Sequence, residues 1–189
     1  KRRPLVVICD ISGSMERYAR VLLQFIYTIS NGLDKVEAFA FSTRLTRITR
    51  QLRQKEIDVA LDQVVALCQD WGGGTRIGDA LKTFNYRWSR RVLTQGAIVL
   101  IISDGWDRGD IDRLKTEMER LQLNAQRLIW LNPLLGSASY EPLPRGIQAA
   151  LPYIDDFLPV HNLVSLEQLG HLLEQLGERK PVRFRRVFS

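Results

Sequence analysis

Residues 5–15 read Leu-Val-Val-Ile-Cys-Asp-Ile-Ser-Gly-Ser-Met. The apolar run that opens this stretch predicts a strand buried on both faces. The strand ends on a carboxylate, Asp10, and two hydroxyls follow at alternate positions, Ser12 and Ser14. Open α/β sheets bind ligands at the carboxyl ends of their strands, and hard cations such as Mg²⁺ prefer oxygen ligands. Gly13 allows a tight turn that can bring both hydroxyls toward one point.

Two later stretches supply further oxygens for such a site. Gly72-Gly73-Gly74-Thr75 is a flexible loop that ends in a hydroxyl just before a helical pattern, and residues 98–105 are a second buried strand that delivers Asp104. In a parallel sheet, both strand ends and the loop between them can open on one edge. The sequence therefore predicts one divalent cation, Mg²⁺ in the first place, held by five oxygen-bearing side chains: Asp10, Ser12, Ser14, Thr75 and Asp104.

This set resembles the metal-ion-dependent adhesion site (MIDAS) of von Willebrand factor A (VWA) domains, in which Asp-x-Ser-x-Ser is followed by a Thr and then by an Asp. The three parts occur here in family order, and the resemblance extends from Leu5 to about Leu176. Within the superfamily the chain most resembles the bacterial CoxE-like VWA proteins. The resemblance implies a doubly wound, mostly parallel α/β sheet of six strands in the order 3-2-1-4-5-6. Strand three is then antiparallel, helices cover both faces, and the site lies between strands one and four.

The hydrophobic pattern along the chain predicts the same alternation of strands and helices. Strands are expected at residues 5–9, 35–42, 97–103, 127–131 and 156–160, with an exposed antiparallel edge strand at 44–50. Helices are expected at residues 15–30, ending at Asn31-Gly32, and at 55–68, 77–91, 110–123 and 165–176, with one helical turn at 147–151 inside a long loop. Such alternation implies right-handed crossovers and a mostly parallel sheet. We expect a single VWA domain over residues 1–178 and a basic tail over 179–189.

Composition points to a soluble globular domain. The chain is 45% hydrophobic and 25% charged, and no apolar run approaches the ~20 residues of a membrane span. No signal peptide is visible, and the absent initiator Met suggests an excised domain. Cys9 and Cys68 are too few for a disulfide scaffold, so we expect core thiols in a reducing cytoplasm.

Catalytic motifs are missing from the sequence. It contains no Ser-His-Asp arrangement, no Gly-x-Ser-x-Gly elbow and no phosphate loop with Gly-Lys-Ser/Thr. His161 and His171 stand alone. We therefore expect a protein-binding adaptor and not an enzyme. An alternative is a Mg²⁺-dependent phosphotransferase of the haloacid dehalogenase type, but Ser12 stands where that family has its acid/base Asp, and a hydroxyl cannot do that proton work near neutral pH.

Basic residues leave a third function class open. Lys and Arg number 27 against 21 Asp and Glu, which gives a net charge of +6. Arginines recur at positions 44, 47, 50 and 53 and again at 87, 90 and 91. Nucleic acid is one interpretation, but no recognition motif accompanies them, so we favour solvated faces or an acidic protein partner.

The resemblance also implies a partner. CoxE-like VWA proteins are associated with MoxR-type AAA+ ATPases in the maturation of metalloenzymes, and VWA sites leave one coordination position open for an Asp or Glu of a partner. Trp71, Arg76 and Trp106 are candidate partner contacts, although both tryptophans could equally pack in the core. For Trp88 and Trp130 we expect core positions, and for Asp107 a surface charge rather than support of the metal ligands.

Overall fold

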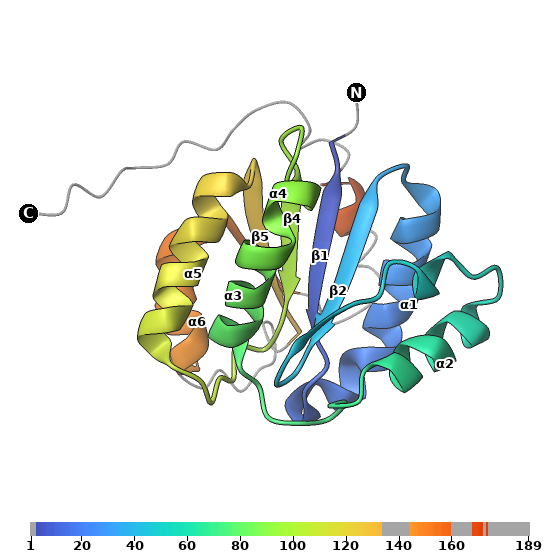
Figure 1. The fold of residues 1–189 in the computed structure, drawn as a ribbon, viewed down its shortest axis with the longest axis horizontal. Coiled ribbons are helices and arrows are strands. Elements are labelled where there is room, and N and C mark those ends of the chain that lie inside the picture. Colours follow the sequence, from blue (N-terminus) through green and yellow to red (C-terminus); the bar gives the residue numbers. More distant parts are fainter. Residues whose placement is uncertain (1–2, 134–143, 160–167, 172, 174–189) are drawn as a thin grey trace, which may run out of the picture.

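A computed structural model describes residues 3–133, 144–159, 168–171 and 173. They form a six-stranded sheet in the order β3-β2-β1-β4-β5-β6 (Figure 1). The strands are β1 Leu5–Asp10, β2 Val36–Phe41, β3 Leu45–Arg47, β4 Ile98–Ile102, β5 Arg127–Asn132 and β6 Asp156–Pro159. β3 runs antiparallel to β2, and the other neighbouring strands are parallel. The predicted fold class, strand order and antiparallel edge strand are confirmed.

The central position of β1 explains why its sequence is apolar at consecutive positions. All six of its residues are buried, because helices cover both faces of the sheet. In the parallel register, Cys9 pairs with Ile102 of β4 on one side and with Ala40 of β2 on the other. The carboxyl ends of β1 and β4 therefore lie next to each other at one edge of the sheet.

Two groups of helices enclose the sheet (Figure 1). The helices are α1 Glu16–Gly32, α2 Ile57–Leu67, α3 Ile77–Arg87, α4 Ser89–Val92, α5 Ile111–Asn124 and α6 Arg145–Ala150, with 3₁₀ turns η1 Gly13–Met15, η2 Gln51–Arg53 and η3 Leu151–Tyr153. Side chains of α1 and α2 share one core cluster with one face of the sheet, and those of α3, α5 and α6 share a second cluster with the other face. The helical residues 168–171 and 173 lie on the α1 side through Leu169.

Two predicted helix boundaries are wrong. Helix α1 continues through Asn31 and ends at Gly32, where the amide of Leu33 donates to the carbonyl of Ile29. The helix predicted over 77–91 is interrupted at Trp88, which separates α3 from α4. The Trp88 ring packs edge-on against Phe39, with 5.5 Å between the ring centroids, so contact with the sheet accompanies the break in the helix.

Tryptophans and cysteines sit largely where the sequence places them. Trp130 is fully buried and its indole N–H donates to the carbonyl of Ser103 at 2.9 Å. Trp88 packs on the same core but is only half-buried. Cys9 and Cys68 are buried and free, as expected for core thiols.

Several sequence-based expectations cannot be compared with the structure. The tail at 179–189, His161 and the first ten residues of the predicted long loop lie outside the described residues. Within the described part of the chain, the helices are too short or too polar to span a membrane.

Candidate metal centre

Three loops meet at the carboxyl edge of β1 and β4. The loop that precedes α3 is tied to the loop after β1, because the Gly72 amide donates to the Ile11 carbonyl at 3.1 Å and the Gly13 amide to the Gly73 carbonyl at 3.3 Å. A Cβ on Gly13 would lie 3.1 Å from the carbonyl oxygen of Gly72, so this close approach favours glycine. The sequence brings Thr75 to this edge two residues after the second contact.

Asp10 ends β1 as a fully buried carboxylate. Its Oδ1 accepts from the Ser12 amide at 2.9 Å, and its Oδ2 accepts from the Ser103 hydroxyl at 2.6 Å. Burial raises the pKa of Asp10 to about 6 against the effect of these hydrogen bonds, and the nearby charge of Asp104 raises it further. An ionised carboxylate at this position therefore lacks sufficient compensation from the protein alone.

Asp104 is the second buried carboxylate at this edge, with 1% of its surface exposed. Oδ1 accepts from the Trp106 amide at 3.1 Å, whereas Oδ2 is buried and has no hydrogen-bond partner among the described residues. Burial raises the pKa of Asp104, and the nearby Ser14 hydroxyl opposes that shift. A buried carboxylate oxygen without a donor is costly, and a cation beside it would remove that cost.

The hydroxyl ligands predicted from the sequence lie at the same edge. The Oγ atoms of Ser12 and Ser14 are 3.3 Å apart. Thr75 is 5% exposed, and its carbonyl accepts from the Arg108 amide at 2.9 Å. Nowhere in the described ranges do three His, Cys, Asp or Glu side chains converge. The donors available here are two carboxylates and neutral hydroxyls, a set that fits a hard divalent cation.

Sequence reasoning missed Ser103 and Ser42. Ser103 is fully buried, and it links the two strand ends by donating to Asp10 and accepting from the Gly105 amide at 3.0 Å. The carbonyl of Ser42 accepts from the Arg76 amide at 3.0 Å and so fixes the end of the glycine loop. The only available signal was position, since Ser103 and Ser42 each directly follow a buried apolar run.

The interpretation of Asp107 as a surface charge is wrong. Asp107 is 8% exposed, and its Oδ1 accepts from the amides of Ile77 at 3.0 Å and Gly109 at 3.2 Å. The carboxylate thus joins the loop after β4 to the first turn of α3, directly after Thr75 and Arg76. A capping acceptor at a helix N-terminus explains its burial.

The candidate partner contacts differ in exposure. Trp106, two residues after Asp104, is 54% exposed. Arg76 is also exposed, and its guanidinium lies 3.7 Å from Asp79. Trp71 is partly buried and packs against the core cluster on the α1 side. Of the two tryptophans left open by the sequence, only Trp106 is exposed.

Comparison with known proteins shows the family and the fold of the chain. The profile of the family described as "VWA domain containing CoxE-like protein" matches residues 1–166. No curated protein matches the chain. Among solved structures, the fold is similar to the conserved hypothetical protein BatB from Bacteroides thetaiotaomicron, with a TM-score of 0.58 at 17% identity over 94% of this chain and 100% of that one.

Two further solved structures show the same fold. An aerotolerance-related membrane protein from Bacteroides fragilis has a TM-score of 0.55 at 14% identity, over 92% of this chain and 100% of that one. Proximal thread matrix protein 1 of the mussel byssus, solved with a zinc-occupied MIDAS motif, has a TM-score of 0.54 at 16% identity, over 93% of this chain and 44% of that one.

Proposed function

Because this chain belongs to the family of CoxE-like proteins that contain a VWA domain, we propose that it is an adaptor that binds an acidic side chain of a partner protein through a bound divalent cation. The observation that carries the proposal is the buried pair of carboxylates at the ends of β1 and β4. Asp10 has a raised pKa and Asp104 has a buried oxygen without a donor, so both gain from a cation.

The ligands in this proposal are the five predicted side chains: Asp10, Ser12, Ser14, Thr75 and Asp104. The cation is Mg²⁺, because the donors are oxygens and Mg²⁺ keeps several waters. One structural neighbour, the mussel byssus protein, holds zinc in its MIDAS motif, which supports a divalent ion at this place in the fold. When bound, the cation supplies an unsaturated positive charge at which a carboxylate can attach.

The partner we propose is a MoxR-type AAA+ ATPase or its client, bound in the cytoplasm. The family supports this choice, and the net charge of +6 favours acidic partners through electrostatic steering. Trp106 and Arg76 would contact the partner beside the metal, since both side chains are exposed next to the candidate ligands. Trp71 would contribute less, because it packs against the core.

Co-purification tests this function. We expect the cognate ATPase or its client to co-purify with the wild-type chain in Mg²⁺, to be lost in chelator, and to be lost with Asp10→Asn and Ser12→Ala. Lys115→Ala, an exposed change on α5, is the matched control and should retain the partner. Binding that survives both the chelator and the substitutions would refute recognition through the metal.

Phosphatase activity provides the corresponding test against the enzyme alternative. We expect no turnover of a generic aryl phosphate in Mg²⁺, because the Ser12 hydroxyl cannot act as a general acid or base near neutral pH. Turnover that disappears in Asp10→Asn would instead support a phosphotransferase.

Ser103→Ala tests the support around Asp10. The Ser103 hydroxyl donates to Oδ2 of Asp10 and accepts from Gly105, so it orients the carboxylate and joins the two strand ends. Removing such an outer hydrogen bond typically lowers metal affinity by 10–100-fold, and we expect about 10-fold here. Titration calorimetry with Mg²⁺ measures the loss, and Ser89→Ala on α4, distant in sequence from every candidate ligand, is the control. Unchanged affinity would show that Ser103 does not orient a ligand.

A further inference from the structure

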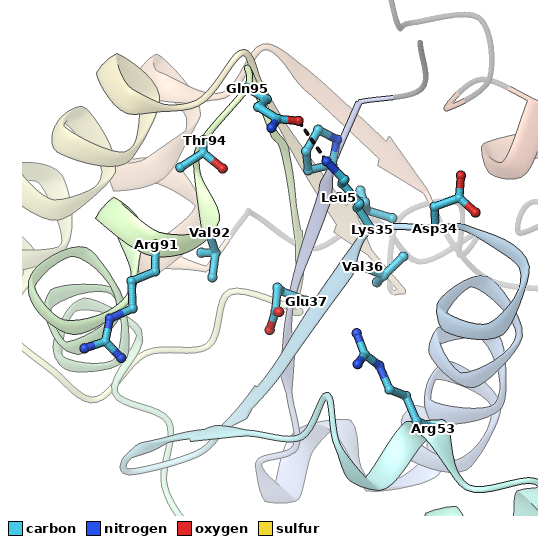
Figure 2. Close-up of a pocket in the computed structure, with 11 residues that line it drawn as sticks. Leu5, Asp34, Lys35, Val36, Glu37, Arg53, Arg91, Val92, Thr94 and Gln95 are labelled. Carbon is cyan, nitrogen blue, oxygen red and sulfur yellow. Dashed lines mark hydrogen bonds between the residues drawn. The ribbon is translucent and has the colours of Figure 1, made fainter.

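A pocket of about 200 Å³ lies at the sheet edge opposite the candidate metal centre (Figure 2). It is lined by the amino ends of β1 and β2, including Leu5 and Val36, which are paired in the sheet. Arg53 of η2 and Arg91 of α4 line it from two other elements. Because each strand is about six residues long at ~3.3 Å per residue, roughly 15–20 Å separate this pocket from the metal ligands. A partner group bound in one site therefore leaves the other accessible.

Positive side chains outnumber acidic ones in the lining. Lys35, Arg53 and Arg91 line the pocket together with two acidic residues, Asp34 and Glu37. Figure 2 shows Arg53 extending from η2 toward Val36 and Glu37, and Lys35 meeting Gln95 above them. Lys35, Arg53 and Arg91 are all exposed. The pocket can therefore present positive charge to a ligand that approaches from solvent.

The negative charge of Glu37 is already compensated. Arg47 donates to both of its carboxylate oxygens, at 2.8 and 3.0 Å, and the Thr49 hydroxyl donates at 2.8 Å. Arg47 does not line the pocket, so this bidentate pair neutralises Glu37 from outside it. Of the five charged groups in the lining, only Asp34 then opposes the three cations.

None of the three cations forms a direct ion pair with a carboxylate among the described residues, although the charge of Arg53 helps to lower the pKa of Glu37. Lys35 donates to the side-chain oxygen of Gln95 at 2.9 Å, which is a neutral acceptor. The guanidinium of Arg91 lies 6.0 Å from the centre of the Trp88 ring, a neutral aromatic face that leaves its N–H donors available to a ligand. Arg53 forms no salt bridge with a described residue.

We propose that this pocket is a second docking site, independent of metal, that binds an acidic segment of a partner protein. The volume suits one or two carboxylate side chains, and the three cations come from η2, from α4 and from the residue before β2, so different acidic residues of one peptide can meet different cations. The pocket's affinity does not depend on the metal centre. Its consequence, that the chain holds two partners at opposite sheet edges, rests on the proposed adaptor function.

A polyphosphate or a nucleic acid fits the lining less well than an acidic peptide does. Asp34 lines the pocket without the compensation that Glu37 receives and would face the concentrated negative charge of a polyphosphate. Phosphate sites commonly use a glycine-rich loop with converging backbone amides, whereas the only glycine-rich loop in the chain, residues 72–74, belongs to the opposite edge. Nucleic acid binding also uses exposed aromatic rings for stacking, and the nearby Trp88 is half-buried with Arg47 and Arg91 over its ring.

Fluorescence anisotropy of labelled decaglutamate with the full chain in EDTA tests the proposal. We expect saturable binding that weakens as salt increases. Arg53→Ala and Arg91→Ala should each weaken it by about two- to five-fold, the range for a single exposed ion pair. The Arg53→Glu/Arg91→Glu double variant should weaken it by at least about ten-fold, because repulsion then replaces attraction. Asp10→Asn should not change it.

Two controls make the result decisive. Lys115→Ala removes one exposed positive charge from α5, away from the pocket, and should leave affinity unchanged; an equal loss in this variant would show diffuse attraction and overturn the proposal. Tripolyphosphate or an oligonucleotide that binds more tightly than decaglutamate, with the same loss in the arginine variants, would overturn the assignment to an acidic protein segment. Because EDTA is present throughout, the binding of decaglutamate is measured without any metal. A failure of the metal-dependent co-purification would therefore not change this result, and each proposal can be refuted without the other.

Discussion

Asp10→Asn is expected to abolish binding of divalent cations while leaving the fold intact. The substitution removes the negative charge of a fully buried carboxylate, and with it the main electrostatic reason for a cation to bind between the ends of β1 and β4. We expect affinity for Mg²⁺ to fall by at least about 100-fold, because the removed ligand charge is almost wholly desolvated. Titration calorimetry with Mg²⁺ and with Mn²⁺ measures the loss.

Retention of the fold follows from the hydrogen bonds around the side chain. Asn keeps the oxygen that accepts from the Ser12 amide, and the Ser103 hydroxyl can rotate to accept from the new amide group. Removing the charge also removes repulsion with Asp104. Thermal melting in EDTA should therefore differ from wild type by only a few degrees. A collapsed fold would show that the charge of Asp10 is structural, and full metal affinity would remove Asp10 from the ligand set.

Gly105→Ala is expected to be among the most destabilising single-methyl additions in the chain. Gly105 has φ +77, which side chains rarely adopt, and a Cβ there would lie 2.0 Å from Cγ1 of Ile147 on α6. Left-handed backbone costs roughly 1–2 kcal/mol and overpacking typically 1–3 kcal/mol, so we expect a loss of about 3 kcal/mol. For a domain of this size the midpoint of thermal unfolding should fall by roughly 6–12 °C.

Two comparisons separate the steric clash from the backbone strain. Gly32→Ala, where a Cβ would meet nothing within 4 Å, should leave stability unchanged or raise it slightly. In Gly105→Ala/Ile147→Ala, removal of the isoleucine relieves the clash, so the double variant should lose less stability than the sum of the single variants. Strictly additive losses would show that Ile147 does not restrict the position. Chemical denaturation measures the free energy of unfolding of each variant. The part of the stability loss in Gly105→Ala that Ile147→Ala does not rescue is the cost of the backbone conformation.

Local patterns in the sequence were sufficient to predict the helices and strands that are apolar throughout or strongly periodic. The runs at residues 5–9 and 97–103 predicted buried strands correctly, because each is short, rich in β-branched residues and apolar up to the polar residue at its end. The N-terminal cap of α5 could also be predicted from the sequence. Asp110 accepts from the amides of Asp112 and Arg113, so the contact is confined to four consecutive residues. These features depend on residues that are neighbours along the chain, so they can be predicted from the sequence alone.

The sequence also determined which chemistry the carboxyl edge of the sheet offers. The types and order of Asp10, Ser12, Ser14, Thr75 and Asp104 are those of an oxygen site for a hard cation, and their coordination of a metal stays a prediction. What the tertiary structure added is the burial of both carboxylates and the orphaned Oδ2 of Asp104.

Only the tertiary structure decided the contacts that join distant segments. Ser103 meets Asp10 because β1 and β4 pair in a register that brings Cys9 opposite Ile102, and a shift by one residue would turn the serine to the other face. Asp107 is buried because it reaches the first turn of α3, thirty positions away. Trp88 divides a helix that its own sequence would continue, where its ring packs on Phe39 of β2. These three features are the register of two strands, the burial of a polar side chain and the end of a helix against a sheet. Each depends on how segments far apart in the sequence pack together, and a local sequence pattern carries no information about the free energy of that packing.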